Sequence, residues 1–296
     1  MEKIAVLLAV YNGREWIDEQ LQSILEQKDV ELDIHISVDL STDGSYEYLM
    51  DKYSNLKNIF FLPYGTRFGS AGKNFYNLIL NVSLENYTYI SFADQDDIWN
   101  EKKLRVAIDR LNKNNADSYS GNVTAFWSSG RKLIIDKAQP QVKFDFIFEA
   151  AGPGCTYVFN KKLAKEFKLF LYNNSHAQTI ELHDWALYAF ARSRNYKWFI
   201  DPQPFMLYRQ HDNNQVGANS SLKAWLKRIN LVRSSWYRNE IKKILISLGD
   251  FNNDMVRLNI ARGYFGNIVL AANICNLRRR NRDRFMLLLL LITNSF

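Results

Sequence analysis

The stretch "YTYISFADQDDIW" (residues 87–99) places three aspartates directly after an apolar run. Carboxylates as close together as Asp94, Asp96 and Asp97 repel one another, and each raises the pKa of its neighbours unless a positive group lies among them. Alternate residues of a strand share a face, so Asp94 and Asp96 point to the same side of the chain. Mg²⁺ and Mn²⁺ prefer hard oxygen ligands of this kind. The stretch therefore predicts a divalent-cation site, with a solvated polar turn as the alternative.

The hundred residues around this stretch alternate between two hydrophobic patterns. Apolar runs predict strands at 4–10, 32–39, 59–62 and 87–94, and helical spacing predicts helices at 15–27, 45–53, 73–82 and 101–114. Strand–helix–strand units form parallel sheets with right-handed crossovers, and ligands bind such sheets at the carboxyl ends of the strands. We therefore expect an α/β fold, a mostly parallel Rossmann-like sheet flanked by helices. The segment "YNG" (11–13), Asp39 and the aspartates should lie at its ligand edge.

Charge is distributed unevenly along the chain. Residues 1–221 carry 24 Lys and Arg against 27 Asp and Glu, a net charge of −3, whereas residues 222–296 carry 14 against 4, a net charge of +10. The second part also has apolar residues at helical spacing with basic residues between them. The apolar set is Leu222, Trp225, Leu226, Ile229, Val232 and Trp236, and the basic set is Lys223, Lys227, Arg228 and Arg233. We expect a globular domain over 1–221, with halves at 1–100 and 101–221, and a basic amphipathic helical tail over 222–296.

The tail has two interpretations. Several basic residues on an amphipathic helix are enough for reversible docking on an anionic membrane surface. The alternative is a set of helices packed on the body with a solvated charged face. Nucleic acid is a weaker interpretation, because the basic residues flank no recognition motif, and we expect no nucleic-acid partner.

Compartment is indicated by cysteine usage and by the lengths of the apolar segments. Cys155 and Cys275 form no CxxC pair, which favours a reducing compartment. The apolar run "FMLLLLLI" (285–292) is shorter than the roughly 18–20 residues that a spanning helix needs. We therefore expect a cytoplasmic protein attached peripherally to the inner face of the plasma membrane.

Three segments together resemble a known family. The segments "LLAVYNGREWIDEQLQSILEQ" (7–27), "SVDLSTDGS" (37–45) and "FADQDDIWNEKKL" (92–104) stand in the order and spacing of family 2 glycosyltransferases of the GT-A fold. With "LHDW" (182–185) and "YRQHDNNQVG" (208–217), the chain is similar to the branch that contains bacterial rhamnosyltransferases of surface polysaccharides. The resemblance covers about residues 3–217. It implies a nucleotide-sugar donor, Mn²⁺ or Mg²⁺, inversion at the anomeric carbon, a nucleotide-binding half at 1–100 and an acceptor-binding half at 101–221.

The resemblance assigns the cation and nucleotide residues. It implies that Asp96 ligates the metal, that Asp94 lies nearer the ribose while still reaching the metal, and that His211 reaches the metal or the diphosphate. It places the donor's base near Ala9 to Tyr11 and near Asp39. A carboxylate can accept a hydrogen bond from N3–H of uracil or thymine, although turn formation or helix capping is the alternative for Asp39. Helix N-capping is an equal alternative for Asp43, which matches a weaker position of the family pattern.

A glycine-rich segment, "YGTRFGSAGKNF" (64–75), follows the third predicted strand. Arg67 and Lys73 could neutralise a diphosphate there, and three glycines would permit close backbone approach. The three glycines are Gly65, Gly69 and Gly72. Family members have a comparable segment, and Arg209 is a further candidate for the diphosphate.

The segment "ELHDWALYAF" (181–190) matches the part of the family that carries the catalytic base. An inverting transfer needs one base for the acceptor hydroxyl and no protein nucleophile. The resemblance implies that Asp184 is this base. The structural alternative is that Asp184 is a helix N-cap. His183 could also act as the base, because the ordinary pKa of histidine is suitable. The segment 151–160 resembles the acceptor-side loop. We therefore expect acceptor contacts at Gly154, Cys155 and Trp185, with Cys155 as small packing and not a nucleophile.

These residues lead to one functional prediction. We expect an inverting, metal-dependent glycosyltransferase that moves L-rhamnose from dTDP-rhamnose to a hydroxyl of a growing, polyprenyl-linked cell-surface polysaccharide. A UDP-hexose donor is the first alternative. A sugar nucleotidyltransferase is less favoured, because "YNGREW" (11–16) is not the Gly-rich, Arg-containing loop of that class. A non-catalytic carbohydrate-binding protein would have no use for Asp96 and Asp184 together.

Overall fold

The computed structural model describes residues 2–211, 235–249 and 254–296. The helical pattern predicted from residue 222 and the boundary predicted after residue 221 fall outside these ranges, apart from Trp236. The segment 212–217 of the predicted "YRQHDNNQVG" loop also falls outside them.

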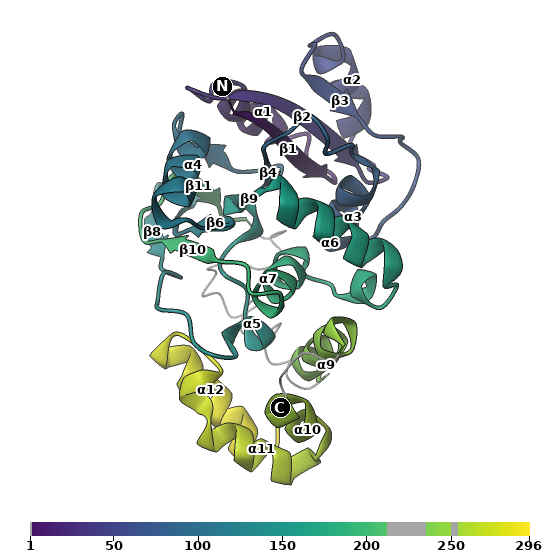
Figure 1. Cartoon of the computed structure of the whole chain (residues 1–296). Helices are drawn as coiled ribbons and strands as arrows, with labels where there is room; N and C mark the ends of the chain where they lie inside the picture. Colours follow the sequence, from purple (N-terminus) through teal and green to yellow (C-terminus); the bar gives the residue numbers. More distant parts are fainter. Residues whose placement is uncertain (1, 212–234, 250–253) are drawn as a thin grey trace.

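A seven-stranded sheet forms the centre of the molecule (Figure 1). Its strand order is β10-β6-β9-β4-β1-β2-β3, and all neighbouring strands are parallel except at β9, which is antiparallel to both β4 and β6. The strands are β1 (Lys3–Val10), β2 (Glu31–Val38), β3 (Ile59–Phe61), β4 (Tyr89–Ala93), β6 (Ser118–Gly121), β9 (Val158–Asn160) and β10 (Trp198–Asp201). The mostly parallel sheet predicted from the sequence is confirmed.

Helices cover both faces of this sheet, as the continuous apolar strands require. Alternate residues of β1 belong to two different hydrophobic clusters, with Leu7 in one and Leu8 in the other. The cluster around Leu8 is covered by α1 (Ile17–Leu25), α2 (Ser45–Tyr53) and α4 (Lys103–Asn114). The cluster around Leu7 is covered by α3 (Ala71–Asn81), α6 (Lys161–Asn173) and α7 (His183–Ser193). Four of these helices, α1 to α4, lie within two residues of their predicted bounds.

A second, four-stranded sheet has the order β5-β11-β7-β8. Its strands are β5 (Ile98–Trp99), β7 (Val123–Phe126), β8 (Lys132–Ile135) and β11 (Met206–Arg209). Strand β11 pairs antiparallel with β5, which immediately follows the aspartates. This pairing carries the end of β11, and with it His211, to the aspartates at the end of β4.

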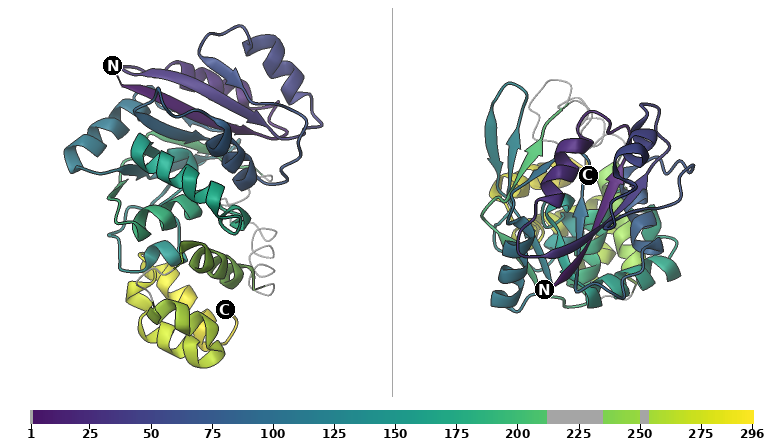
Figure 2. Two further views of the ribbon diagram at one scale, coloured as in Figure 1. Left: turned by 45° about the vertical axis from the view of Figure 1, so that its right-hand side comes forward. Right: turned by 90° about the horizontal axis from the view of Figure 1, so that it is seen from above.

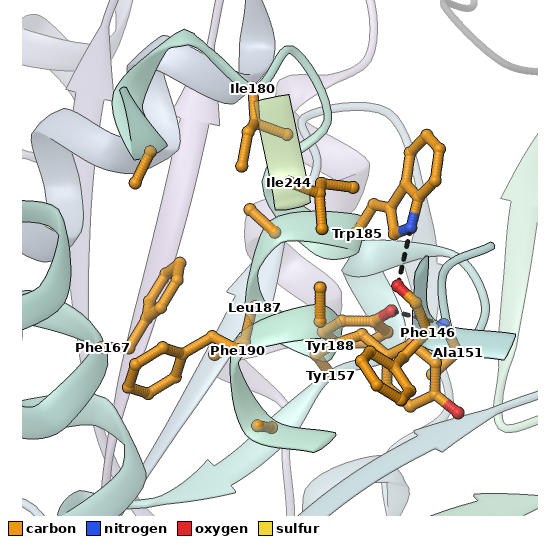
Figure 3. Packing of buried hydrophobic residues seen from close by; sticks show 14 of the residues in the cluster. Phe146, Ala151, Tyr157, Phe167, Ile180, Trp185, Leu187, Tyr188, Phe190 and Ile244 are labelled. Atoms are coloured by element: carbon orange, nitrogen blue, oxygen red, sulfur yellow. Dashed lines mark hydrogen bonds between the residues drawn. The ribbon is translucent and has the colours of Figure 1, made fainter. Parts of the chain in front are cut away.

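The chain after residue 235 forms helices at the end of the molecule away from β1, β2 and β3 (Figures 1 and 2). These are α9 (Trp236–Leu248), α10 (Asp254–Ala261), α11 (Gly263–Ala272) and α12 (Asn281–Ile292), which follows a short 3₁₀ turn (Ile274–Asn276). Their inner side chains share the cluster that covers α7, and Figure 3 shows Ile244 of α9 beside Ile180 and Trp185. The described part of the predicted tail is therefore helical and packed on the body.

Candidate active site

The turn after β4 is tied to the end of β1 by Gln95. Its side-chain oxygen accepts from the Tyr11 N–H at 2.7 Å, and its amide nitrogen donates to the Tyr11 carbonyl at 2.9 Å. Gly13 makes room for this contact, because a Cβ there would lie 2.4 Å from Gln95 Oε1. Gln95 was not identified from the sequence, where the nearest signal is Gly13, the glycine that follows the first strand.

Asp96 and His211 meet beside this turn, as predicted. His211 Nε2 lies 2.7 Å from Asp96 Oδ2, and the two side chains are 17% and 11% exposed. The Trp16 ring stacks on His211 with 4.1 Å between ring centroids. Arg209 donates from Nε to the Asp96 carbonyl at 2.8 Å, and its guanidinium pairs with Glu19. Arg209 therefore holds the aspartate turn in place.

Asp94, Asp97 and Cys155 form a second group directly behind Asp96, with one ligand atom of each within 4.8 Å of the others. Burial, followed by the charges of Asp96 and Asp184, raises the pKa of Asp94 to about 7. Burial and the charges of Asp96 and Asp94 raise the pKa of Asp97 well above its usual range. Asp97 Oδ2 is buried and has no hydrogen-bond partner among the described residues. The three carboxylates therefore cannot all ionise at neutral pH unless a positive group joins them.

Two neighbouring side chains show why this charge remains uncompensated. Burial lowers the pKa of Lys103 to about 7, so this amine offers only a partial counter-charge; its Nζ lies 3.3 Å from the centre of the Trp99 ring. Burial and the charges of Asp97 and Asp94 raise the pKa of the Cys155 thiol well above its usual range. A protonated thiol is a poor ligand for a hard cation. Asp94, Asp96, Asp97 and His211 therefore offer oxygen and imidazole donor atoms of the kind that divalent cations accept, whereas the Cys155 thiol does not.

Asp184 lies in the first turn of α7, at the same site. Burial raises the pKa of its carboxyl to about 6, against the opposing effects of the Trp185 and Gly154 N–H groups and of the Lys137 charge. Its charge in turn raises the pKa of Asp94, which places the two carboxylates within electrostatic reach of each other. The N-cap residue of α7 is Leu182, so the capping alternative for Asp184 is wrong. Asp184 is a half-buried carboxylate within electrostatic reach of Asp94.

His183 does not fit the role of base. Its ring stacks on Phe75 with 3.8 Å between centroids and meets Phe92 edge-on at 5.1 Å. Burial lowers the pKa of His183 to about 3, so the imidazole is neutral and weakly basic. A Cβ at Gly154 would lie 2.7 Å from His183 Nε2 and 3.0 Å from Asp184 Cβ. Gly154 thus lets the 151–160 loop pass directly over both residues.

The predicted nucleotide residues surround the end of β1. Tyr11 is 44% exposed, whereas Ala9 is 8% exposed and contributes mainly backbone. The Asp39 carboxylate accepts from three backbone N–H groups, those of Leu40, Phe68 and Gly69, at 2.7–2.9 Å. Asp39 therefore has the turn-forming role that was the alternative to base binding, and it holds the loop 64–70 next to the end of β1.

In the glycine-rich segment 64–75 the glycines have structural roles, and the basic side chains are exposed to solvent. Gly65 and Gly69 have φ values of 115° and 78°, a backbone conformation that favours glycine. Gly72 was expected to allow close approach of a ligand, but a Cβ there would lie 2.1 Å from the Glu181 carbonyl oxygen. The close approach at Gly72 is thus to the segment before α7, which corrects that expectation. Arg67 and Lys73 have exposed side chains.

Asp43 also has a structural role. Its carboxylate accepts from the Ser45 N–H at the start of α2 and from the Arg14 N–H, both at 3.0 Å. The N-cap residue of α2 is Gly44, so Asp43 binds the first N–H group of the helix without being its N-cap. Asp43 therefore joins the loop after β2 to the loop after β1.

The expected acceptor residues differ in accessibility. Gly154 lies against Asp184, but the Cys155 side chain is fully buried and Trp185 is 3% exposed. Trp185 Nε1 donates to the Phe146 carbonyl at 3.0 Å, and Figure 3 shows the ring within the hydrophobic cluster. This corrects the expectation that the Cys155 and Trp185 side chains line the acceptor site.

Lys137 was not identified from the sequence, where no motif surrounds it. It follows β8, and burial lowers the pKa of its amine despite the nearby charges of Glu149 and Asp283. Its positive charge lowers the pKa of Asp184. Lys137 therefore contributes to the electrostatic environment of the carboxylate from the segment that follows β8.

A cavity of about 560 Å³ lies elsewhere, near the amino ends of β6 and β10. Its lining includes Ala116, Lys143, Tyr196 and Trp198, and none of the predicted site residues. Since β6 and β10 run parallel to β4, this cavity is at the opposite edge of the sheet from the aspartates.

Comparisons with known proteins identify the family of the chain. Residues 5–152 match the family described as Glycosyl transferase family 2. The chain is 55% identical to the dTDP-rhamnosyl transferase RfbG of Shigella flexneri over 293 residues, which cover 98% of this chain and 100% of that protein. It is 24% identical to the UDP-Glc:alpha-D-GlcNAc-diphosphoundecaprenol beta-1,3-glucosyltransferase WfgD of Escherichia coli over 55% of this chain and 62% of that protein.

The fold also matches solved structures. The structure of S. aureus TarS 1–349 in complex with UDP-GlcNAc matches with a TM-score of 0.56 at 16% sequence identity, and covers 99% of this chain and 89% of that chain. This likeness confirms the expected GT-A fold. The chain belongs to glycosyl transferase family 2, and it is a glycosyltransferase.

Proposed function

We propose that this protein transfers L-rhamnose from dTDP-L-rhamnose to a hydroxyl of a growing surface polysaccharide, with inversion at the anomeric carbon and with Mn²⁺ or Mg²⁺. The observation that carries the proposal is the 55% identity, over nearly the whole chain, to a protein named a dTDP-rhamnosyl transferase. A UDP-hexose is the second candidate donor, since a more distant relative is named a UDP-glucose enzyme. Residues 1–221 would form the catalytic domain, with the nucleotide on the first half and the acceptor on the second.

In this proposal the donor lies across the carboxyl ends of β1 and β4. The exposed Tyr11 ring and the backbone at Ala9 contact the base, on the side that the Asp39-bound loop 64–70 encloses. The exposed side chains of Arg67 and Lys73 neutralise the diphosphate. These contacts are supported by the positions of the residues at one edge of the sheet.

Asp96, His211 and Asp94 would hold the divalent cation. Bound there, the cation acts as a Lewis acid that stabilises the charge of the departing nucleoside diphosphate. The uncompensated carboxylates support this assignment, because an opposite charge among them lowers the electrostatic cost of the cluster.

Asp184 is the proposed general base. Its carboxylate takes the proton from the acceptor hydroxyl as the hydroxyl oxygen bonds to the anomeric carbon, and the bond from that carbon to the diphosphate oxygen breaks on the opposite face. A pKa of about 6 leaves the carboxylate mostly ionised at neutral pH while keeping it close to the pH at which it works. The acceptor sugar would approach past Gly154, which lies against Asp184.

We further propose that the enzyme works in the cytoplasm at the inner face of the plasma membrane, on a polyprenyl-linked acceptor. Both cysteines are free thiols, which suits a reducing compartment. Among the described residues, no helix has both the length and the hydrophobicity to cross a bilayer. The attachment in this proposal is therefore peripheral.

A donor screen tests the proposed function. The purified protein would be supplied with dTDP-L-rhamnose or UDP-glucose, an acceptor extract, and Mn²⁺, Mg²⁺ or a chelator, and nucleoside diphosphate release would be measured. We expect release from dTDP-L-rhamnose that depends on the cation and is lost in Asp96→Asn. Equal rates after exhaustive chelation would overturn the cation's role, and turnover of UDP-glucose alone would overturn the rhamnose assignment.

A further inference from the structure

The two outermost helices of the C-terminal region expose large apolar side chains. Phe265 of α11 is 84% exposed, and Phe285 and Met286 of α12 are 59% and 54% exposed. Ile268 and Val269 on α11 and Ile292 on α12 are also exposed. We call these six residues the α11–α12 face. Monomeric proteins rarely leave so many large apolar residues exposed on adjacent elements without a partner.

The spacing shows that this exposure belongs to one side of each helix. Phe265, Ile268 and Val269 recur at intervals of three and four residues, as do Phe285 and Ile292 over two turns. The opposite sides carry Leu270, Leu287 and Leu291, which are buried against the body. Both helices therefore have one apolar side for the core and a second apolar side that faces outward.

The positive charge around this face comes from arginine and not from lysine. From residue 254 to the end the chain has seven arginines, no lysine and two aspartates. Two of the arginines, Arg278 and Arg279, point inward, while Arg262 and Arg282 are exposed next to the apolar side chains. The Arg282 side chain is 73% exposed and lies three residues before Phe285 on the same side of α12. Guanidinium groups bind phosphate oxygens in a bidentate way that ammonium groups cannot.

We propose that the α11–α12 face docks on an anionic phospholipid bilayer, with its aromatic and aliphatic side chains in the acyl boundary and Arg262 and Arg282 on lipid phosphates. The inference deepens the peripheral attachment proposed above and rests on it. Helix α12 has 12 residues and is about 18 Å long at 1.5 Å per residue, so it lies in the interface and does not cross a hydrocarbon core of about 30 Å. A second copy of the chain is a poorer occupant, because symmetric docking would bring two sets of arginines together.

The same region lies within electrostatic reach of the proposed base. The charges of Arg278 and Arg279, in the segment before α12, act on Lys137, and the charge of Lys137 acts on Asp184.

Vesicle cosedimentation of the full-length protein tests the proposal. Point variants are needed, because the inner residues of these helices belong to the core and truncation would remove them. We expect wild-type protein to bind vesicles of phosphatidylglycerol and phosphatidylcholine and not of phosphatidylcholine alone. Phe265→Ser with Phe285→Ser should weaken binding at least about tenfold, and Arg262→Glu with Arg282→Glu should weaken it at least about fivefold.

A matched control lies on α6. Leu169 and Tyr172 are 59% and 78% exposed there, so Leu169→Ser with Tyr172→Ser removes similar apolar surface from another part of the molecule. This control should bind vesicles as wild type does. Equal vesicle binding by all variants, or an equal loss of binding in the control, would overturn the proposal. A dimer in gel filtration that only the face variants lose would also overturn it, because a second copy of the chain would then cover the face. Nucleoside diphosphate release measured without vesicles should be unchanged in the face variants, and it reports separately on the proposed function.

Discussion

The carboxyl edge of the seven-stranded sheet and the helices after residue 235 both bury charge, but they do so in opposite ways. At the sheet edge, Asp94, Asp96 and Asp97 are gathered with little positive charge among them, and burial with mutual repulsion raises the pKa values of Asp94 and Asp97. In the C-terminal region, buried Arg279 lies 3.3 Å from Asp145 and 3.6 Å from Glu149. Charge that lacks a counter-charge points to a ligand, whereas charge that is already paired points to folding.

The buried, paired arginines also change the interpretation of the basic tail. Arg278 and Arg279 belong to the run "LRRRNRDR" (277–284) of the basic tail. From the sequence alone, these charges could be interpreted as facing a membrane. Arg279 is fully buried, its backbone N–H donates to Glu149 at 2.7 Å, and one guanidinium nitrogen donates to the Ala150 carbonyl at 2.7 Å. The alternative of packing on the body is therefore correct for these two residues, and it leaves Arg262 and Arg282 as the exposed charges beside the apolar face.

The largest expected effect is on stability and tests the inner side of this region. Arg279→Met should lower the free energy of unfolding by about 3 kcal/mol, the lower end of the range for breaking a buried ion pair, because Asp145 then keeps only Arg192 and Glu149 only Arg278 as charged partners. Urea unfolding followed by circular dichroism measures the change. Asp145→Asn in the Arg279→Met background should restore part of the loss, since it removes a buried charge that has lost one of its two arginines.

Arg282→Met is the matched control for this experiment. Its side chain is exposed and its pairing with Asp283 is at the surface, so the variant should change stability by less than about 1 kcal/mol. Equal destabilisation by Arg279→Met and Arg282→Met would contradict the division of this region into a buried, ion-paired inner side and a solvent-exposed outer side.

The fold could be predicted where the signal is local. Strands β1 to β4 and helices α1 to α4 follow from apolar runs and helical spacing, and Ser45–Tyr53 was predicted without error in its bounds. The second sheet could not be predicted in this way, because its strands have two to four residues and show too little periodicity. The antiparallel insertion of β9 between β4 and β6 depends on pairing between residues far apart in the chain.

The second prediction tests the base at the sheet edge. Asp184→Asn should reduce transfer by at least about a hundredfold, the usual scale for loss of a general base, and leave donor binding nearly unchanged. Steady-state turnover and calorimetric titration with the nucleotide sugar measure the two quantities. Asp184→Asn is nearly isosteric, and equal losses of binding and turnover would contradict the assigned role.

The site itself was predictable to the extent that its residues belong to motifs. Asp94, Asp96, Asp184 and His211 were identified in this way, and the structure brings the aspartates and His211 to one edge. Gln95 stood within the motif, but its partner Tyr11 is 84 positions away, and a side-chain contact of that kind leaves no local pattern. The opposite error occurred at Trp185, where motif membership suggested exposure and packing in the core made the side chain inaccessible.

The third prediction tests this bridge between β1 and β4. Gln95→Ala removes both hydrogen bonds to the Tyr11 backbone, worth about 1–3 kcal/mol together. We expect donor KM to rise about tenfold, because Tyr11 loses its fixed position, while the melting temperature falls by only about 2–8 °C. Asn81→Ala removes two side-chain hydrogen bonds to Asn77 on the exposed side of α3 and should leave KM unchanged.

The smallest effect is expected for Lys137, which links the two regions. With a pKa of about 6 for Asp184, turnover should fall as pH decreases through about 6, because protonation removes the base. The Lys137 charge lowers that pKa, so Lys137→Gln should move the acidic limb of the pH profile upward by roughly half a unit to one unit. Lys137→Arg should keep the wild-type limb, whereas a purely structural role would lower the maximum rate without moving it. If Arg282→Met also moved the acidic limb of the pH profile, the shift would reflect the overall charge of the protein. The position of Lys137 near Asp184 would then not be its cause.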